Sequence, residues 1–198
     1  MEEVETTTDP EKVSEESLPR TRAMQDEFTR SFLQSTEEVE EGYYRFRSGT
    51  NRFEMNLSTA GKIGEKSYAV DKGFEQVAIG IEQSSYAIGI TIEYISHLKK
   101  DNLETNLSLF GSIAEELDFD RMQQGGSDRF YSKFRRDEND VFLAYVQNTK
   151  DSGGILISYY IDCLETDHSC GTKSQEDEFF KWLKSFQFKE KGMGEEDQ

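Results

Sequence analysis

The chain has 198 residues, of which 34% are hydrophobic, and it carries a formal net charge of -17. This acidity disfavours binding to nucleic acid or to anionic lipid, because Lys and Arg supply most of the affinity for phosphate groups. No apolar run approaches the roughly 18–20 residues that a membrane-spanning helix needs. The composition therefore favours a single globular domain with polar ends.

The acidic residues are concentrated at the two ends. Residues 1–41 carry 13 acids against 4 bases, and residues 189–198 carry 4 acids against 2 bases. We expect residues 1–20 to be a disordered acidic tether and 189–198 a disordered acidic tail, because their few apolar side chains cannot offset the entropy of ordering. The acidic beginning is unlike a signal or transit peptide, which indicates either a cytosolic protein or one whose signal has been removed.

The segment 21–41 combines an apolar period with a second acidic patch. Met24, Phe28 and Phe32 recur every four residues. This spacing predicts one short amphipathic helix from about residue 21 to residue 34, followed by an acidic linker. We place the boundary of a single domain at residue 42 and its end at residue 188.

Alternating apolar residues predict four or five strands in the first half of this domain. Two short runs, 44–46 and 53–57, flank a polar Ser-Gly-Thr-Asn turn and form a hairpin signal. Two longer runs, 77–81 and 86–94, are apolar at every second position and are separated by a short polar turn. The second of these has Ala, Gly and Thr on its other face, which leaves room for a covering element.

A helix is expected next. Asp101 and Glu104 have the spacing of a capping box, and the apolar residues that follow are three or four positions apart. We therefore expect a continuous helix with one buried face over residues 101–117. The stretch Gln123–Gly126 has the composition of a loop.

Three strands and a helix are predicted to complete the domain. The runs 130–136, 141–146 and 155–161 are joined by short polar turns, which favours antiparallel pairing. A capping-type Ser174 then precedes an apolar stripe that includes Phe179, Phe180 and Leu183. Trp182 lies beside this stripe, so we expect it near the outer edge of the helix and only partly buried.

The order of elements predicts an α+β fold, an antiparallel sheet with helices packed on its faces. The layout resembles the Mog1/PsbP-like α/β sandwich over residues 42–188. The resemblance is carried by the aromatic hairpin Tyr43–Phe46 and Phe53–Met55, the helix Asp101–Leu117, the meander Phe130–Asp162 and the closing Phe179–Leu183. Together with the acidic tether and the cysteine pair, the chain is similar to the mature part of small Gram-positive surface lipoproteins. It departs from them in lacking a lipobox and its cysteine.

Cys163 and Cys170 are the only cysteines and are separated by six residues. We expect a disulfide that closes the loop between the last long strand and the last helix and that stabilises the fold by roughly 2–3 kcal/mol. The alternative is a pair of free thiols in a cytosolic protein. A disulfide would imply an oxidising compartment.

Other candidate sites are weak. His168 lies between the two cysteines beside Asp167, so a metal site there is conceivable, whereas His97 fits a surface residue at a strand end. The carboxylates at 115–120 and 137–140 match solvated turns better than a calcium loop. The sequons at Asn56 and Asn106 matter only in a glycosylating host, and no phosphate-binding glycine motif, nucleophile elbow or cofactor signature is present.

These observations predict a non-enzymatic, extracytoplasmic binding or accessory domain, the monomeric mature part of a lipid-anchored bacterial lipoprotein. Its expected partner is a protein or a component of the cell envelope, not nucleic acid, with no cofactor and with membrane contact only through an N-terminal anchor. Two alternatives stay open. One is a small hydrolase or metal-dependent enzyme that uses His168 and nearby carboxylates; the other is a cytosolic acidic protein that binds basic partners.

Overall fold

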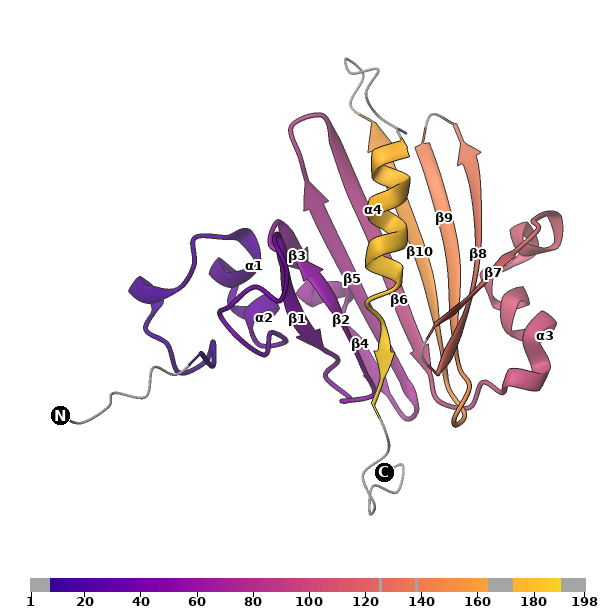
Figure 1. Ribbon diagram of the computed structural model, residues 1–198, viewed down its shortest axis with the longest axis horizontal. Helices are drawn as coiled ribbons and strands as arrows, with labels where there is room; N and C mark the ends of the chain where they lie inside the picture. The colour runs from indigo at the N-terminus through magenta and orange to yellow at the C-terminus, as the bar shows by residue number, and fades with distance from the viewer. Residues whose placement is uncertain (1–7, 125, 138, 164–172, 190–198) are drawn as a thin grey trace.

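The computed structural model describes residues 8–124, 126–137, 139–163 and 173–189 and consists mostly of antiparallel sheet (Figure 1). The strands are β1 (Tyr43–Arg47), β2 (Phe53–Ser58), β3 (Gly61–Ile63), β4 (Ala69–Asp71), β5 (Phe74–Glu82), β6 (Tyr86–Ile95), β7 (Asp120–Gln124), β8 (Ser127–Arg136), β9 (Asn139–Asn148), β10 (Gly154–Cys163) and β11 (Gln187–Phe188). The helices are α1 (Arg22–Gln25), α2 (Glu27–Arg30), α3 (Leu103–Leu107) and α4 (Lys173–Leu183). Short 3-10 turns occur at Glu15–Ser17, Glu65–Ser67, Lys100–Asn102, Ser108–Phe110 and Ser112–Glu116.

Two sheets form the framework. The large sheet has the order β3-β5-β6-β10-β9-β8-β7, with β4 paired beside β3 on the outer side of β5, and the small sheet has the order β1-β2-β11. Every described pairing is antiparallel, as the short connections predict. The predicted antiparallel sheet is confirmed, and among the described residues the helices are few and only α4 exceeds five residues.

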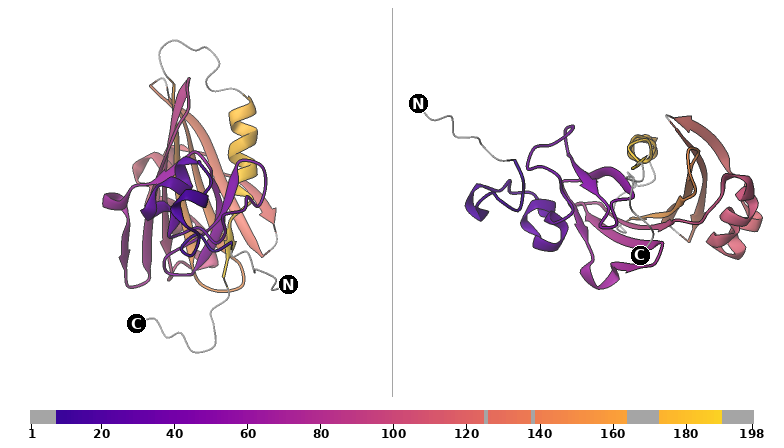
Figure 2. Two further views of the ribbon diagram at one scale, coloured as in Figure 1. Left: turned by 90° about the vertical axis from the view of Figure 1, so that its left-hand side faces the viewer. Right: turned by 90° about the horizontal axis from the view of Figure 1, so that it is seen from below.

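The main core lies on one face of the large sheet, which we call the inner face. Inward residues of β5, β6, β9 and β10 meet α4 and the small sheet there. The ring of Phe142 in β9 stacks on that of Phe179 in α4 with centroids 4.3 Å apart, and Phe53 of β2 stacks on Phe186 at 6.1 Å. Figure 2 shows α4 on this side of the sheet and α3 beyond the opposite side.

Trp182 is buried, so the prediction of a partly exposed residue at the helix edge is wrong. Only 6% of its surface is exposed, and its indole N–H donates to the carbonyl oxygen of Asn56 at 2.9 Å. The helical pattern placed Trp182 beside the apolar stripe, but β2 of the small sheet covers that side of α4. Phe180, in contrast, is only half-buried.

The predicted helix over residues 101–117 is also wrong in its extent. Only the short helix α3 forms, and 3-10 turns flank it. The helical backbone is interrupted at Gly111, whose φ is 84°. A left-handed residue cannot continue a right-handed helix. Leu103, Leu107 and Phe110 nevertheless pack as expected on a small second cluster of the outer face.

Residues 8–41 form an N-terminal arm whose helices contact β3 of the large sheet and whose last part runs along β1 of the small sheet. The expected single helix is divided into α1 and α2 at Asp26, whose backbone is extended and whose side-chain carboxylate caps α2 by accepting from the backbone N–H of Thr29 at 3.0 Å. Leu18 and Met24 are buried in the main core. Contacts with the domain therefore begin before residue 20. Residues 1–7 and 190–198 lie outside the described residues.

The stretch expected to be a loop at residues 123–126 instead includes the end of β7. This strand pairs with β8 from Asp120 to Gln124 and forms one end of the large sheet. Its residues are mostly exposed and polar, so apolar alternation was absent from the sequence.

Candidate functional site

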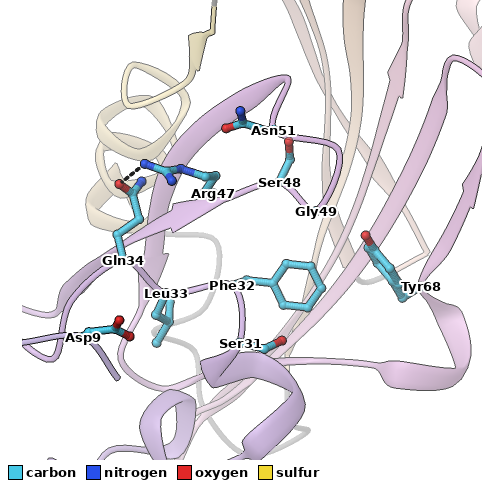
Figure 3. A pocket seen from close by; sticks show the side chains of 10 residues that line it. All are labelled: Asp9, Ser31, Phe32, Leu33, Gln34, Arg47, Ser48, Gly49, Asn51 and Tyr68. Carbon is cyan, nitrogen blue, oxygen red and sulfur yellow. Dashed lines mark hydrogen bonds between the residues drawn. The ribbon is translucent and has the colours of Figure 1, made fainter. Parts of the chain in front are cut away.

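An open pocket of about 660 Å³ lies where the N-terminal arm meets the turn between β1 and β2 (Figure 3). We call it the arm pocket. It is lined by Asp9, Ser31, Phe32, Leu33, Gln34, Arg47, Ser48, Gly49, Asn51 and Tyr68. These side chains come from the arm, from the end of β1 and its turn, and from the segment before β4.

The arm wall is fixed because the chain after α2 runs along the free edge of β1. The backbone N–H of Gln34 donates to the oxygen of Arg45 at 3.0 Å, and the N–H of Arg47 donates to the oxygen of Phe32 at 2.9 Å. Below this edge, the Phe32 ring stacks on Phe46 with centroids 5.5 Å apart. The arm therefore acts as an additional edge segment of the small sheet and holds Gln34 beside the end of β1.

Gln34 and Arg47 form the polar corner of the arm pocket, as Figure 3 shows. Arg47 Nη2 donates to Gln34 Oε1 at 2.8 Å, and its Nε donates to Glu54 Oε1 at 3.3 Å. The other amide atom, Gln34 Nε2, is buried and has no hydrogen-bond partner among the described residues. A buried donor without a partner costs free energy, so it marks a position where an acceptor is missing.

The opposite wall is held from below by the buried carboxylate of Glu75. Glu75 is 0% exposed and accepts from the backbone N–H groups of Gly49 at 2.7 Å and of Thr50 at 3.1 Å. It also accepts from the hydroxyls of Thr50 and, at 3.3 Å, of Tyr68. This carboxylate has only neutral donors as hydrogen-bond partners in the described chain, and together they fix the turn that carries one side of the pocket.

Two further features show that the turn is built for close approach. A side chain at Gly49 would collide with the Tyr68 hydroxyl, so only glycine fits there. Burial and then the Glu75 charge raise the pKa of Tyr68 to about 12, which keeps this hydroxyl protonated as a donor.

Asn51 has a left-handed backbone with φ at 55°, and no hydrogen bond joins its side-chain amide to a described residue. The arm pocket thus offers neutral amide groups, one guanidinium and one carboxylate.

The predicted cysteine site lies partly outside the described residues. Cys163 is the last residue of β10, whereas Cys170 and His168 fall within residues 164–172, which the structure does not describe. The disulfide therefore stays a prediction, and so does the alternative metal site at His168.

The other candidates from the sequence do not come together. His97 is exposed in the turn after β6, as expected for a surface residue. Asp140 lies within 3.8 Å of the Lys133 ammonium and 3.7 Å of the Arg135 guanidinium, so it is part of an ion-pair network. Within the described ranges, no three His, Cys, Asp or Glu side chains are placed to hold a metal ion.

Both sequon asparagines have structural roles. Asn106 is 2% exposed and its amide donates to the Tyr145 hydroxyl at 2.9 Å. Asn56 donates to Glu40 Oε1 at 2.6 Å. The burial of Asn106 makes it inaccessible for glycosylation in the folded domain.

The sequence analysis did not identify Gln34, Arg47 or Glu75. One signal was available for Glu75. It lies on the same face of β5 as Val77, Ile79 and Ile81, so a carboxylate occupies a core position. An acid at such a position needs dedicated hydrogen-bond donors. No comparable signal existed for Gln34, because its position depends on the arm folding back along β1.

None of the described helices could cross a membrane.

Comparisons with known proteins agree with the extent of this fold. No curated protein and no solved structure matched the chain. One family model, YvcA_Mog1p, described as "Putative lipoprotein YvcA", matches residues 19–187, a span that includes most of the N-terminal arm. The chain therefore belongs to the YvcA/Mog1p lipoprotein family, whose members are lipid-anchored on the extracytoplasmic surface.

Proposed function

We propose that this protein is a non-enzymatic binding domain that recognises a component of the cell envelope through the arm pocket. The family is one of lipoproteins with an extracytoplasmic accessory role and is not a known enzyme class. To this accessory role we add a binding role, a site and a ligand class. We further propose that the domain acts as a monomer.

The observation that carries the proposal is the unpaired donor Gln34 Nε2. It is buried in the wall of a pocket that opens to solvent, and the Arg47 guanidinium donates to the other atom of the same amide at 2.8 Å. A ligand oxygen placed there would accept from Gln34 and would remove the cost of the unpaired group. Retaining such a group is reasonable where it serves binding, because polar groups held by a rigid scaffold fix a ligand's orientation.

The charges favour a neutral ligand. The described lining residues include one acid, Asp9, and one base, Arg47, and the whole chain carries -17. A net charge of this size repels polyanions over the distance of a Debye length. Hydroxyl groups both donate and accept, so they match the mixed set of amides, carboxylate and hydroxyls in the lining. A polyhydroxylated ligand, such as the glycan of the bacterial envelope, fits this set best.

The test is a titration of the ¹⁵N-labelled domain with soluble peptidoglycan fragments. We expect saturable shifts of the Gln34 side-chain amide and of the Gly49 backbone N–H, which donates to Glu75 below the pocket. Gln34→Ala and Asn51→Ala should each weaken binding by about tenfold, which corresponds to the loss of one or two hydrogen bonds. Gln123→Ala, in exposed strand β7, is the matched control and should bind as the wild type does.

Gln34→Ala should also leave stability nearly unchanged, within about 1 kcal/mol, because it deletes a donor without a described partner, and water can replace its oxygen at the exposed Arg47 guanidinium. Shifts that spread over the surface without saturation, or equal binding by the two pocket variants and the control, would refute the site. Hydrolysis of the fragments during the titration would refute the non-enzymatic role and would favour the enzyme alternative.

A further inference from the structure

A second, separate cavity lies between α4 and the inner face of the large sheet. It has room for about 30 Å³, and three tyrosines, Tyr43, Tyr86 and Tyr159, contribute to its lining. Glu178 of α4 and the chain's single tryptophan, Trp182, also line it. The rest of the wall is mainly aliphatic, largely from β5 and β6, and includes the polar residues Ser58 and Gln83.

Glu178 is the only charged group among the described residues of this lining. The Tyr43 hydroxyl donates to Glu178 Oε1 at 3.2 Å, and no cation of the described chain forms an ion pair with that carboxylate. Burial first, and the Glu178 charge second, raise the pKa of Tyr43, of Tyr86 and of Tyr159. The cavity is therefore a region of negative potential whose hydroxyls stay protonated.

One lysine lies close to this cavity but is paired with another acid. Lys181 lies one position beyond Phe180 on α4, and its ammonium is ion-paired with Glu40 at 2.8 Å. The same ammonium lies 5.3 Å from the centre of the Tyr43 ring, yet Lys181 is not part of the cavity lining. This contact places a cation over the ring of Tyr43.

The size of the cavity limits its occupant. A single water needs roughly 10–15 Å³ of cavity space. The available space therefore holds about two waters or one group of that size. Aromatic faces together with a carboxylate are the arrangement that attracts organic ammonium ions, because the ring quadrupole and the anion act in the same direction. A neutral apolar group would gain contact with the aliphatic wall but would leave Glu178 without a countercharge.

We propose that this cavity binds a free, small organic ammonium ion, with Glu178 as the countercharge and the tyrosine and tryptophan rings as its walls. The site is independent of the arm pocket and shares no lining residue with it. Binding here would bridge α4, the sheet and β1, since the lining residues come from all three.

Trp182 supplies the measurement, because the chain's only tryptophan lies in the wall of this cavity. The full chain is titrated with methylammonium chloride while its tryptophan fluorescence is followed. Sodium chloride controls for ionic strength, and methanol controls for a neutral molecule of similar size. We expect a saturable change with methylammonium and none with either control.

Two charge-neutral variants of the same helix decide the mechanism. Glu178→Gln removes the charge of this exposed side chain but keeps its shape. It should weaken methylammonium binding by about tenfold or more, equivalent to ~1.4 kcal/mol. Glu176→Gln removes a carboxylate that is paired with Lys133 at 3.1 Å and is not in the cavity lining, so it should leave binding unchanged. Thermal unfolding of both variants verifies that the fold is retained.

A fluorescence change that methanol reproduces, a change that never saturates, or equal binding by Glu178→Gln and the wild type would each overturn the proposal. The first two results would mean that the cavity holds only water or a neutral solute. The third would mean that the ammonium ion binds elsewhere.

Discussion

The two halves of the large sheet differ in how many of their faces are covered. In β9 every residue from Asp140 to Asn148 is buried, because α4 lies on one face and the cluster around α3 on the other. In β6 the apolar residues of the inner face are buried, whereas Gly89 on the outer face is exposed. The sheet is therefore a three-layer structure at β9 and a two-layer structure at β6.

The difference explains the two apolar patterns in the sequence. A strand covered on both faces needs apolar residues at consecutive positions, and a strand covered on one face needs them at every second position. The outer cover at β9 is thin, since it consists of α3 and short 3-10 turns. Each half can be tested by substitutions on its two faces.

The largest effect is expected where α4 meets the inner face. Phe179→Ala should lower the free energy of unfolding by about 3–5 kcal/mol, because Phe179 is 0% exposed and stacks on Phe142. Its neighbour Phe180 is half-buried and contacts the Tyr131 ring at 4.8 Å, so Phe180→Ala should cost less than half as much. Urea denaturation of both variants measures the difference; equal losses would contradict the position of α4.

A smaller effect is expected on the outer face at the start of β10. A Cβ built on Gly154 would lie 2.5 Å from the Tyr145 ring and hydroxyl. Gly154→Ala should therefore destabilise the protein by about 1–3 kcal/mol through overpacking. The measurement is the midpoint of thermal unfolding, and an unchanged midpoint would show that Tyr145 can move aside.

The outer cluster also contains a polar network that a single substitution can weaken. The Tyr145 hydroxyl donates to Gln147 Oε1 and accepts from Asn106 Nδ2 at 2.9 Å. Tyr145→Phe should cost about 1 kcal/mol, the value of a typical internal hydrogen bond, because Asn106 keeps its bond to Lys99 O at 2.9 Å. Hydrogen exchange of the α3 amides should accelerate in this variant while that of α4 stays unchanged; acceleration in both would mean that the two faces are not independent.

The smallest effect is expected on the open outer face. No atom lies within 4 Å of a Cβ built on Gly89, and its backbone is not left-handed. Gly89→Ala should change stability by less than about 1 kcal/mol, and in the stabilising direction, because alanine restricts the unfolded chain. Gly154→Ala serves as the paired comparison under identical conditions. A marked loss of stability in Gly89→Ala would reveal that something covers this face.

The long strands could be predicted because their signals are local. Val141–Val146 is continuously apolar and Tyr86–Tyr94 alternates, and both patterns are confirmed by β9 and β6. The helices were predicted less well, since periodicity does not reveal an interruption such as Gly111 with its φ of 84°. Edge strand β7 has no apolar alternation because little of it is buried.

The sequence by itself determined the antiparallel sheet, the apolar faces of its central strands and the aromatic stripe of α4, because burial is encoded at short and regular spacings. Only the tertiary structure decided what covers each face and where polar groups meet. Gln34 and Arg47 are 13 positions apart, and Tyr43 and Glu178 are 135 positions apart. Such contacts depend on the paths of the arm and of α4 across the sheets, and no local pattern of residues specifies those paths.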